Sequence, residues 1–151
     1  MKYSHYKKTE ESTGLLFWQT TVLWQRKIKE VLQPLDLTHT QFVILAVVEE
    51  LSEKVDEITQ KMISDFSMID VMTVSSTVRL LEKKHYIVRV QSKNDTRAYS
   101  ICNTTQGKER LIQAIKQVED VDSQFFFANK QALTQFQEEL RTLISNNTNS
   151  V

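Results

Sequence analysis

Hydrophobic residues recur along the first part of the chain at the spacing of an α-helix. Five apolar side chains follow one another at intervals of seven, four, three and four residues: Phe17, Trp24, Ile28, Val31 and Leu35. This spacing places them on one helical face. It predicts a first helix from about residue 11 to 33, which ends before Pro34 because proline has no N–H and restricts the preceding residue. The face is broad for an element near a chain end, so a large surface is needed to cover it.

A capping signal and an apolar run predict a second helix. Thr38 and Gln41 have the spacing of a capping box, in which each side chain bonds the backbone N–H of the other residue. The run Phe42–Val48 is apolar on every side, so this helix, ending near Leu51, is expected at the centre of the core. The run is far shorter than the ~18 residues that span a membrane, and no membrane segment is predicted.

The next segment predicts two helices joined by a short turn. Ile58, Met62 and Phe66 mark a short third helix, and a brief connection leads to Asp70, a residue type that caps helix N-termini. A fourth helix, about 71–84, repeats apolar residues at helical spacing. The residues it is expected to bury are Val71, Val74, Val78 and Leu81. Two helices in this arrangement are a candidate helix-turn-helix.

After His85 the pattern changes to that of a β-hairpin. The segments 86–90 and 98–102 are rich in β-prone side chains, and 92–95 between them is turn-like. A hairpin directly after a helix-turn-helix is a wing. The chain is therefore predicted to be mainly α with a two-stranded β wing, a winged helix-turn-helix.

Two further helices are predicted at the C-terminal end. Thr104 caps a long fifth helix, and a break near 128–130 precedes a sixth. The polar end from Asn146 is expected to fray. The apolar stripes of the first, fifth and sixth helices exceed what one small winged domain covers. A second copy of the chain is therefore expected to cover them.

Composition supports helices over sheets. The chain has 2 Gly and 1 Pro in 151 residues, whereas average usage would give roughly ten and seven. A sandwich or barrel of many short strands needs more turn residues than this. The single Cys102 excludes an internal disulfide framework and fits a reducing compartment. Since the hydrophilic N-terminus predicts no signal peptide, a cytoplasmic protein is expected.

Charge is informative only locally. The chain carries 19 basic and 19 acidic residues, so its net charge identifies no partner. From Arg79 to Arg97, however, there are six basic residues and two acidic ones. The phosphates of duplex DNA complement such a cluster.

The face of the fourth helix opposite its apolar side carries side chains suited to a DNA groove. Its members are Met72, Thr73, Ser76, Arg79, Leu80 and Lys83. Hydroxyls bond phosphates or base edges, Arg grips guanine through two bonds, and apolar atoms contact the thymine methyl. The alternative is an ordinary solvated face. The hairpin that follows, with Lys93 and Arg97 at its tip, favours DNA.

Four motifs occur in an order and at intervals that resemble one family. They are Leu37-Thr38 with Gln41-Phe42 and Leu45, the segment Val71–Lys84, Asp95-Thr96-Arg97, and Thr104-Thr105-Gln106-Gly107. The chain resembles the MarR family of transcriptional regulators from Leu35 to Leu111. Two residues depart from the family pattern. His85 occupies the position after the recognition helix at which the family usually has Gly. Left-handed backbone is favoured there, so strain is expected. Asn103 replaces the Leu that the family usually has before Thr104, and this replacement is expected to weaken packing at the base of the wing.

The resemblance implies a homodimer, joined through the terminal helices, on a roughly palindromic DNA operator. Recognition helices would enter major grooves and Arg97 a minor groove, with Asp95 holding its guanidinium. Three parts follow: an N-terminal dimerisation helix (1–35), a winged helix-turn-helix DNA-binding domain (36–104) and C-terminal dimerisation helices (105–151). The residues expected to contact DNA are Met72, Thr73, Ser75, Ser76, Arg79, Lys83, Lys93, Asn94, Asp95 and Arg97.

The resemblance also implies regulation by a small-molecule effector bound between the dimerisation and DNA-binding regions. Trp18, Trp24 and His39 are the candidate effector contacts, although aromatic residues at helical spacing more often belong to a core or an interface. The three His are scattered, so no metal site is predicted. Cys102 has no activating neighbour and is expected to be inert.

Neither an enzyme nor a cofactor is predicted. The chain has no glycine-rich phosphate loop, no nucleophile elbow and no Cys–His pair at a suggestive spacing. A ligand-responsive repressor is the expected function. The alternative is a winged-helix module that binds protein without contacting DNA. A salt-titrated DNA-binding assay separates the two, because phosphate contacts give steep salt dependence.

Overall fold

The computed structural model describes residues 2–148 of the chain. Over these residues it contains six α-helices, two 3₁₀ turns and one antiparallel hairpin. The helices are α1 (Thr13–Leu32), α2 (His39–Ser52), α3 (Gln60–Ser67), α4 (Val71–Lys83), α5 (Thr105–Phe125) and α6 (Lys130–Thr148). The strands are β1 (Ile87–Gln91) and β2 (Tyr99–Asn103), and the 3₁₀ turns are η1 (Thr9–Glu11) and η2 (Gln33–Leu35). The predicted mainly α class with a two-stranded wing is confirmed.

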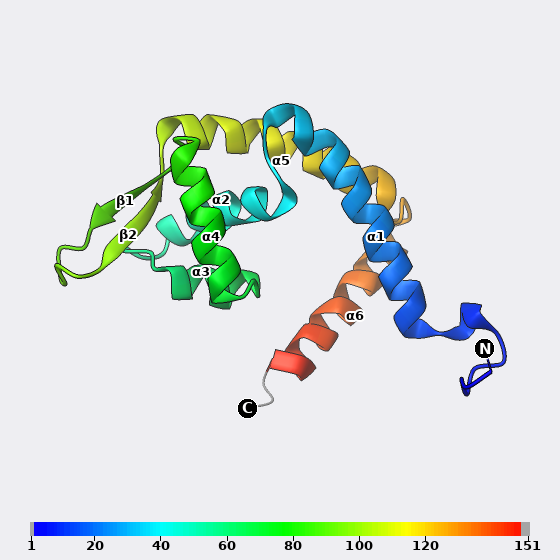
Figure 1. Ribbon diagram of the computed structural model, residues 1–151. Coiled ribbons are helices and arrows are strands. Elements are labelled where there is room, and N and C mark those ends of the chain that lie inside the picture. The colour runs from blue at the N-terminus through cyan, green and yellow to red at the C-terminus, as the bar shows by residue number, and fades with distance from the viewer. Residues whose placement is uncertain (1, 149–151) are drawn as a thin grey trace.

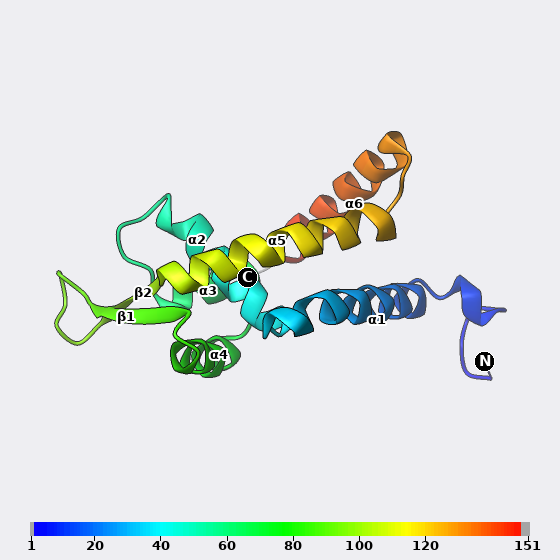
Figure 2. The same ribbon diagram turned by 90° about the horizontal axis from the view of Figure 1, so that it is seen from above.

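The elements form a lobe and an extended helical arm. In Figure 1, α2, α3, α4 and the hairpin gather at one end, while α5 leaves this lobe and runs beside α1. Figure 2 shows the hairpin at one extreme of the molecule and the N-terminal end of α1 toward the other, with α6 folding back from the end of α5. The hairpin and the helix-turn-helix therefore lie together, far from the N-terminal end of α1.

Helix α2 is the centre of the core, as its apolar run predicts. Ile44, Leu45 and Val48 are fully or almost fully buried, and α2 packs against α1, α3, α4, α5 and β2. No single helix within residues 2–148 is long and apolar enough to cross a membrane. The stretches 13–35 and 39–52 reach the length and apolar composition of a membrane span only when taken together, and the two are bent by 78° relative to each other. The buried core helix of a protein meets the same criterion.

Helix starts follow their capping residues. Each of the first five helices begins after a side chain that accepts a hydrogen bond from the third backbone N–H of the helix. These residues are Ser12, Thr38, Thr59, Asp70 and Thr104. The predicted capping box of Thr38 and Gln41 is present in full. Helix α1 ends at Leu32, and Pro34 lies in the 3₁₀ turn that follows.

Two predictions about individual apolar residues are wrong. Val71 is 50% exposed, because it is the first residue of α4 and lies beyond the packed part of that helix. Thr77, only 6% exposed, is buried beside Val74 and Val78 instead. Ile58 precedes α3 rather than belonging to it. Its N–H donates to the Ser100 hydroxyl and its carbonyl accepts from the Ile101 N–H, which fastens it to β2.

Left-handed backbone occurs at three non-glycine residues of the described chain. They are Asp36 (φ 56°), Met68 (φ 64°) and His85 (φ 63°), which follow η2, α3 and the last turn of α4. The left-handed conformation predicted for His85 is confirmed. These residues turn the chain where a glycine is the more usual choice.

Helix α6 contributes no fully buried side chain. Phe136 contacts the rings of Phe126 and Phe127, with centroids 5.9 and 5.5 Å away. The helix continues to Thr148, so the fraying expected from Asn146 is wrong up to that residue. Residues 149–151 lie outside the described residues.

Candidate nucleic-acid interface

The start of α4 is fixed by the carboxylate of Asp70. One oxygen accepts the Thr73 N–H at 2.9 Å, and the other accepts the Thr73 hydroxyl at 2.6 Å. These bonds hold the pKa of Asp70 below its ordinary value, and the bond from the hydroxyl has the larger effect. Thr73, predicted to contact DNA, is half-buried and its hydroxyl proton is used in this cap.

The outward face of α4 is available to a partner along most of its length. Met72 is 83% exposed, and Ser76, Arg79 and Lys83 are also exposed. The Ser76 hydroxyl donates to the Thr73 carbonyl, so its oxygen remains an acceptor. Arg79 donates to the hydroxyl of Ser75, which is half-buried. The face thus presents an apolar group, hydroxyl oxygens and two cations in sequence.

Two of the six basic residues between Arg79 and Arg97 are bound to other elements of the protein, while Arg79 bonds only Ser75 within α4. The Lys84 amine donates to the Asp36 carbonyl at 2.7 Å and to the Gln41 side chain at 2.9 Å. The Arg89 Nε lies 2.9 Å from the Glu82 carboxylate. These pairs tie the end of α4 to the α1–α2 corner and to the wing. The cations left exposed for an external partner are Arg79, Lys83, Lys93 and Arg97.

The wing tip presents Lys93, Asn94, Asp95 and Arg97 to solvent. Asp95 Oδ1 accepts the backbone N–H of Arg97 at 3.0 Å, as Asp side chains commonly do in turns. Within residues 2–148, no ion pair joins Asp95 to the Arg97 guanidinium. The contact between these two side chains that the family resemblance implies is therefore absent from the free chain. The carboxylate shapes the turn instead.

An acid outside the wing also contacts this loop. The carboxylate of Glu57, between α2 and α3, accepts the Ser92 hydroxyl at 2.7 Å and the Lys93 N–H at 2.9 Å. These two bonds lower the pKa of Glu57, and the bond from Ser92 has the larger effect. The partners are 35 and 36 residues away, so no local sequence pattern indicates this contact.

The base of the wing is built on the Thr-x-x-Gly motif. The Thr104 hydroxyl donates to the His85 carbonyl at 2.6 Å, and its N–H donates to the Tyr86 carbonyl at 3.0 Å. A Cβ at Gly107 would lie 2.9 Å from the Tyr86 carbonyl carbon and closer still to its oxygen. Helix α5 therefore approaches the wing at a distance that only glycine permits.

Asn103 attaches the base of the wing to α2. Its side-chain NH₂ donates to the Leu45 carbonyl at 2.9 Å and to Glu49 at 3.2 Å. Its buried Oδ1 has no hydrogen-bond partner among the described residues. Hydrogen bonds thus replace apolar packing at this position. Glu49, near the C-terminal end of α2, takes part in this contact.

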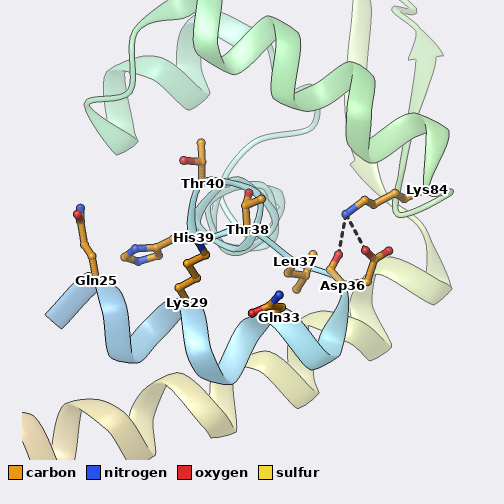
Figure 3. Close-up of a pocket in the computed structure, with 9 residues that line it drawn as sticks. All are labelled: Gln25, Lys29, Gln33, Asp36, Leu37, Thr38, His39, Thr40 and Lys84. Atoms are coloured by element: carbon orange, nitrogen blue, oxygen red, sulfur yellow. Dashed lines mark hydrogen bonds and ion pairs between the residues drawn. The ribbon is translucent and has the colours of Figure 1, made fainter. Parts of the chain in front are cut away.

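A cavity of about 530 Å³ lies where α1 meets the start of α2. Figure 3 shows Gln25 and Lys29 along α1 and Gln33 at the start of η2, with His39 above them and Lys84 reaching Asp36 at the far side. The pKa of His39 is lowered by burial, which outweighs the opposing effect of the Asp122 carboxylate.

A second cavity, about 500 Å³ and mostly apolar, lies between α1, α5 and α6. Its aromatic walls are Phe17, Trp24, Phe125, Phe126 and Phe136. Trp24 also meets the His39 ring edge-on at 5.1 Å, and its N–H donates to Asp122 at 2.8 Å. Of the candidate effector contacts, Trp24 and His39 thus lie together. Trp18 is 67% exposed and lines neither cavity.

No group of three potential metal ligands comes together within residues 2–148. Cys102 is a half-buried free thiol in β2. Its predicted lack of reactivity stays a prediction.

A helix-turn-helix with an exposed second helix, followed by a basic hairpin, defines a winged-helix DNA-binding protein. The MarR family model matches residues 37–99. YdcH of Bacillus subtilis, an uncharacterized HTH-type transcriptional regulator, is 38% identical over 126 residues, which are 83% of this chain and 86% of YdcH. The chain belongs to the MarR family, and it is a transcriptional regulator rather than an enzyme.

Solved structures share the fold. A MarR mutant from E. coli complexed with operator DNA has a TM-score of 0.78 and 21% identity, covering 86% of this chain and 91% of that one. CouR from Rhodococcus jostii bound to p-coumaroyl-CoA has a TM-score of 0.81 and 18% identity, covering 97% and 99%. At these identities the likeness shows the fold.

Proposed function

We propose that this regulator is a homodimeric, ligand-responsive repressor that binds a palindromic operator. The observation that carries the proposal is the exposed outer face of α4, followed by a basic wing tip, with the side chains of Arg79, Lys83, Lys93 and Arg97 exposed to an external partner. Phosphates supply the complementary charge, and the α4 face supplies groups that read bases. A MarR mutant from E. coli, which shares the fold, was solved in complex with operator DNA, and this supports DNA as the partner.

In the proposed complex α4 enters the major groove and the wing follows the adjacent minor groove. Met72 lies at the N-terminal end of α4, where recognition helices contact base edges, and its thioether chain suits a thymine methyl. Ser76 offers an acceptor to a base amine, and Arg79 offers two donors to guanine. Arg97, at the wing tip, reaches the narrow and electronegative minor groove.

Dimerisation is proposed through α1, α5 and α6. Large apolar side chains on these helices remain exposed in the single chain: Leu16, Phe17, Trp18, Leu23, Ile112, Leu143 and Ile144. Because α6 buries no residue fully, its apolar stripe is only partly covered by its own chain. A second copy of these helices, burying ~2,000 Å² or more, would cover it. The division into residues 1–35, 36–104 and 105–151 stays a prediction.

An effector is proposed to bind beside the α1–α2 corner, near Trp24 and His39. The first of the two cavities lies between the helical arm and the DNA-binding lobe, so an occupant that prefers one placement of the lobe relative to the arm shifts the population of that state. CouR, of the same fold, was solved with p-coumaroyl-CoA. The role of Trp18 and the cytoplasmic location stay predictions.

The test begins with selection of bound fragments from genomic DNA, followed by anisotropy titrations on the operator and a scrambled duplex. Arg97→Ala is expected to weaken binding to both duplexes and to lower the salt slope by about one. Arg79→Ala is expected to cost about 1–3 kcal/mol on the operator and to relax preference at one base pair per half-site. Lys7→Ala, in the exposed N-terminal segment, is the charge control.

One result of these titrations would rule out DNA contact by the wing. If Arg97→Ala binds both duplexes like the wild-type chain, with an unchanged salt slope, the wing does not touch DNA. A winged-helix module that binds protein would then be favoured.

A further inference from the structure

The wing tip is held from outside the wing by a two-pronged contact. Glu57 Oε2 accepts the hydroxyl of Ser92 at 2.7 Å, while Glu57 Oε1 accepts the N–H of Lys93 at 2.9 Å. Each oxygen thus serves a different donor, and one side chain joins the α2–α3 connection to the first residues after β1.

From Ser92 the hydrogen bonds continue toward Arg97. Ser92 is only 8% exposed, and its oxygen accepts the N–H groups of Asn94 at 3.1 Å and Asp95 at 3.2 Å. The single hydroxyl proton goes to Glu57, which leaves the lone pairs of Ser92 for these two N–H groups. Asp95 in turn accepts the Arg97 N–H at 3.0 Å. A continuous relay therefore runs from Glu57 through Ser92 and Asp95 to Arg97.

Charge and hydrogen bonding predict opposite effects of Glu57 on DNA binding. By charge alone the carboxylate opposes binding, because it lies against Lys93 and adds a negative charge near the phosphates. By hydrogen bonding it favours binding, because a loop already ordered loses less conformational freedom when it docks. The sign of the change in a variant separates the two effects.

We propose that Glu57 is a positioning residue for DNA binding, whose carboxylate holds the loop from Ser92 to Arg97 in the conformation that presents Arg97. This inference rests on the proposed contact between the wing and DNA. Glu57 itself need not touch DNA, since it acts through Ser92 and the Lys93 backbone.

Three variants of the full chain test this role. Glu57→Gln removes the charge and replaces one of the two accepting carboxylate oxygens with an NH₂ donor, so the Ser92 hydroxyl or the Lys93 N–H then faces a donor. Ser92→Ala breaks the relay one step later and keeps the Glu57 charge. Asp56→Asn is the matched control, because Asp56 is the adjacent exposed acid and has no side-chain hydrogen bond or ion pair within residues 2–148.

Operator affinity is measured by anisotropy at several salt concentrations. Glu57→Gln and Ser92→Ala are both expected to weaken binding roughly two- to tenfold, as expected for one or two newly mobile groups. Asp56→Asn is expected to bind like the wild-type chain or slightly more tightly. In an Arg97→Ala background, Glu57→Gln is expected to have little further effect, because the group being positioned is absent.

A second measurement needs no DNA. Backbone ¹⁵N relaxation is expected to give rigid amides for residues 93–97 in the wild-type chain, with order parameters of ~0.85 that fall below ~0.6 in Glu57→Gln. Amides of α2 serve as the internal control for folding. If the wing amides stay rigid in both relay variants, or Glu57→Gln tightens binding as Asp56→Asn does, the positioning role is overturned. If the amides loosen but Arg97→Ala leaves DNA binding unchanged, the relay stands and the wing contact proposed above fails.

Discussion

The two glycines of this chain should respond to alanine in opposite directions. At Gly107 a methyl group would lie 2.9 Å from the Tyr86 carbonyl carbon, well inside the ~3.5–4.0 Å of an ordinary contact. The backbone of α5 or of the wing must therefore move by at least about 0.6 Å to accommodate it. Overpacking of this kind costs about 1–3 kcal/mol, and the better helix propensity of alanine returns about 1 kcal/mol. Because the carbonyl oxygen lies closer still, we expect a net loss of about 2 kcal/mol for Gly107→Ala.

Gly14→Ala is the matched control, since nothing lies within 4 Å of its Cβ position in α1. It should stabilise the chain by up to about 1 kcal/mol through helix propensity. Urea unfolding followed by circular dichroism, at one fixed protein concentration, measures both variants. A loss of about 2 kcal/mol corresponds to a Tm about 4–8 °C lower. A Gly107→Ala chain as stable as wild type would refute the close approach of α5 to Tyr86.

Two further predictions concern assembly and pH. Deleting residues 129–151 should give monomeric or aggregated protein in sedimentation, because α6 carries apolar side chains that its own chain does not cover; a truncated chain that remains a well-folded dimer would contradict this. Burial lowers the pKa of His39, so the unfolded chain binds its proton more readily, and the free energy of unfolding should fall as the pH drops below about 6.5. Urea titrations across that range should show a weaker dependence for His39→Gln, and an identical dependence would assign it to other groups.

Local signals explain why most of the fold could be predicted. The cap at Thr38, the cap at Asp70 and the stop at Pro34 act through bonds within a few residues, so the sequence shows them directly. Val71 and Ile58 were mispredicted because burial at an element's end depends on how far the neighbouring elements extend. Periodicity within one segment carries no information about that distance.

The functional surface could be predicted only in part, because several contacts join distant segments. The exposure of Met72 and Arg79 follows from helical periodicity. Lys84 pairs with Asp36 across 48 residues, and Glu57 pairs with Ser92 across 35. No local pattern marks these partners. Counting charges between Arg79 and Arg97 therefore overstates the cations that remain for DNA.

The left-handed corners at Asp36, Met68 and His85 have a consequence for the unfolded chain. A side chain in this conformation costs roughly 1–2 kcal/mol relative to right-handed backbone. Glycine would remove that strain, but it would also give the unfolded chain more conformations to lose, at roughly 0.5–1 kcal/mol per site. The strain kept at each folded corner is thus partly offset by a stiffer unfolded ensemble. In a chain with 2 glycines, the turns between helices are therefore stabilised partly by the lower conformational entropy of the unfolded chain.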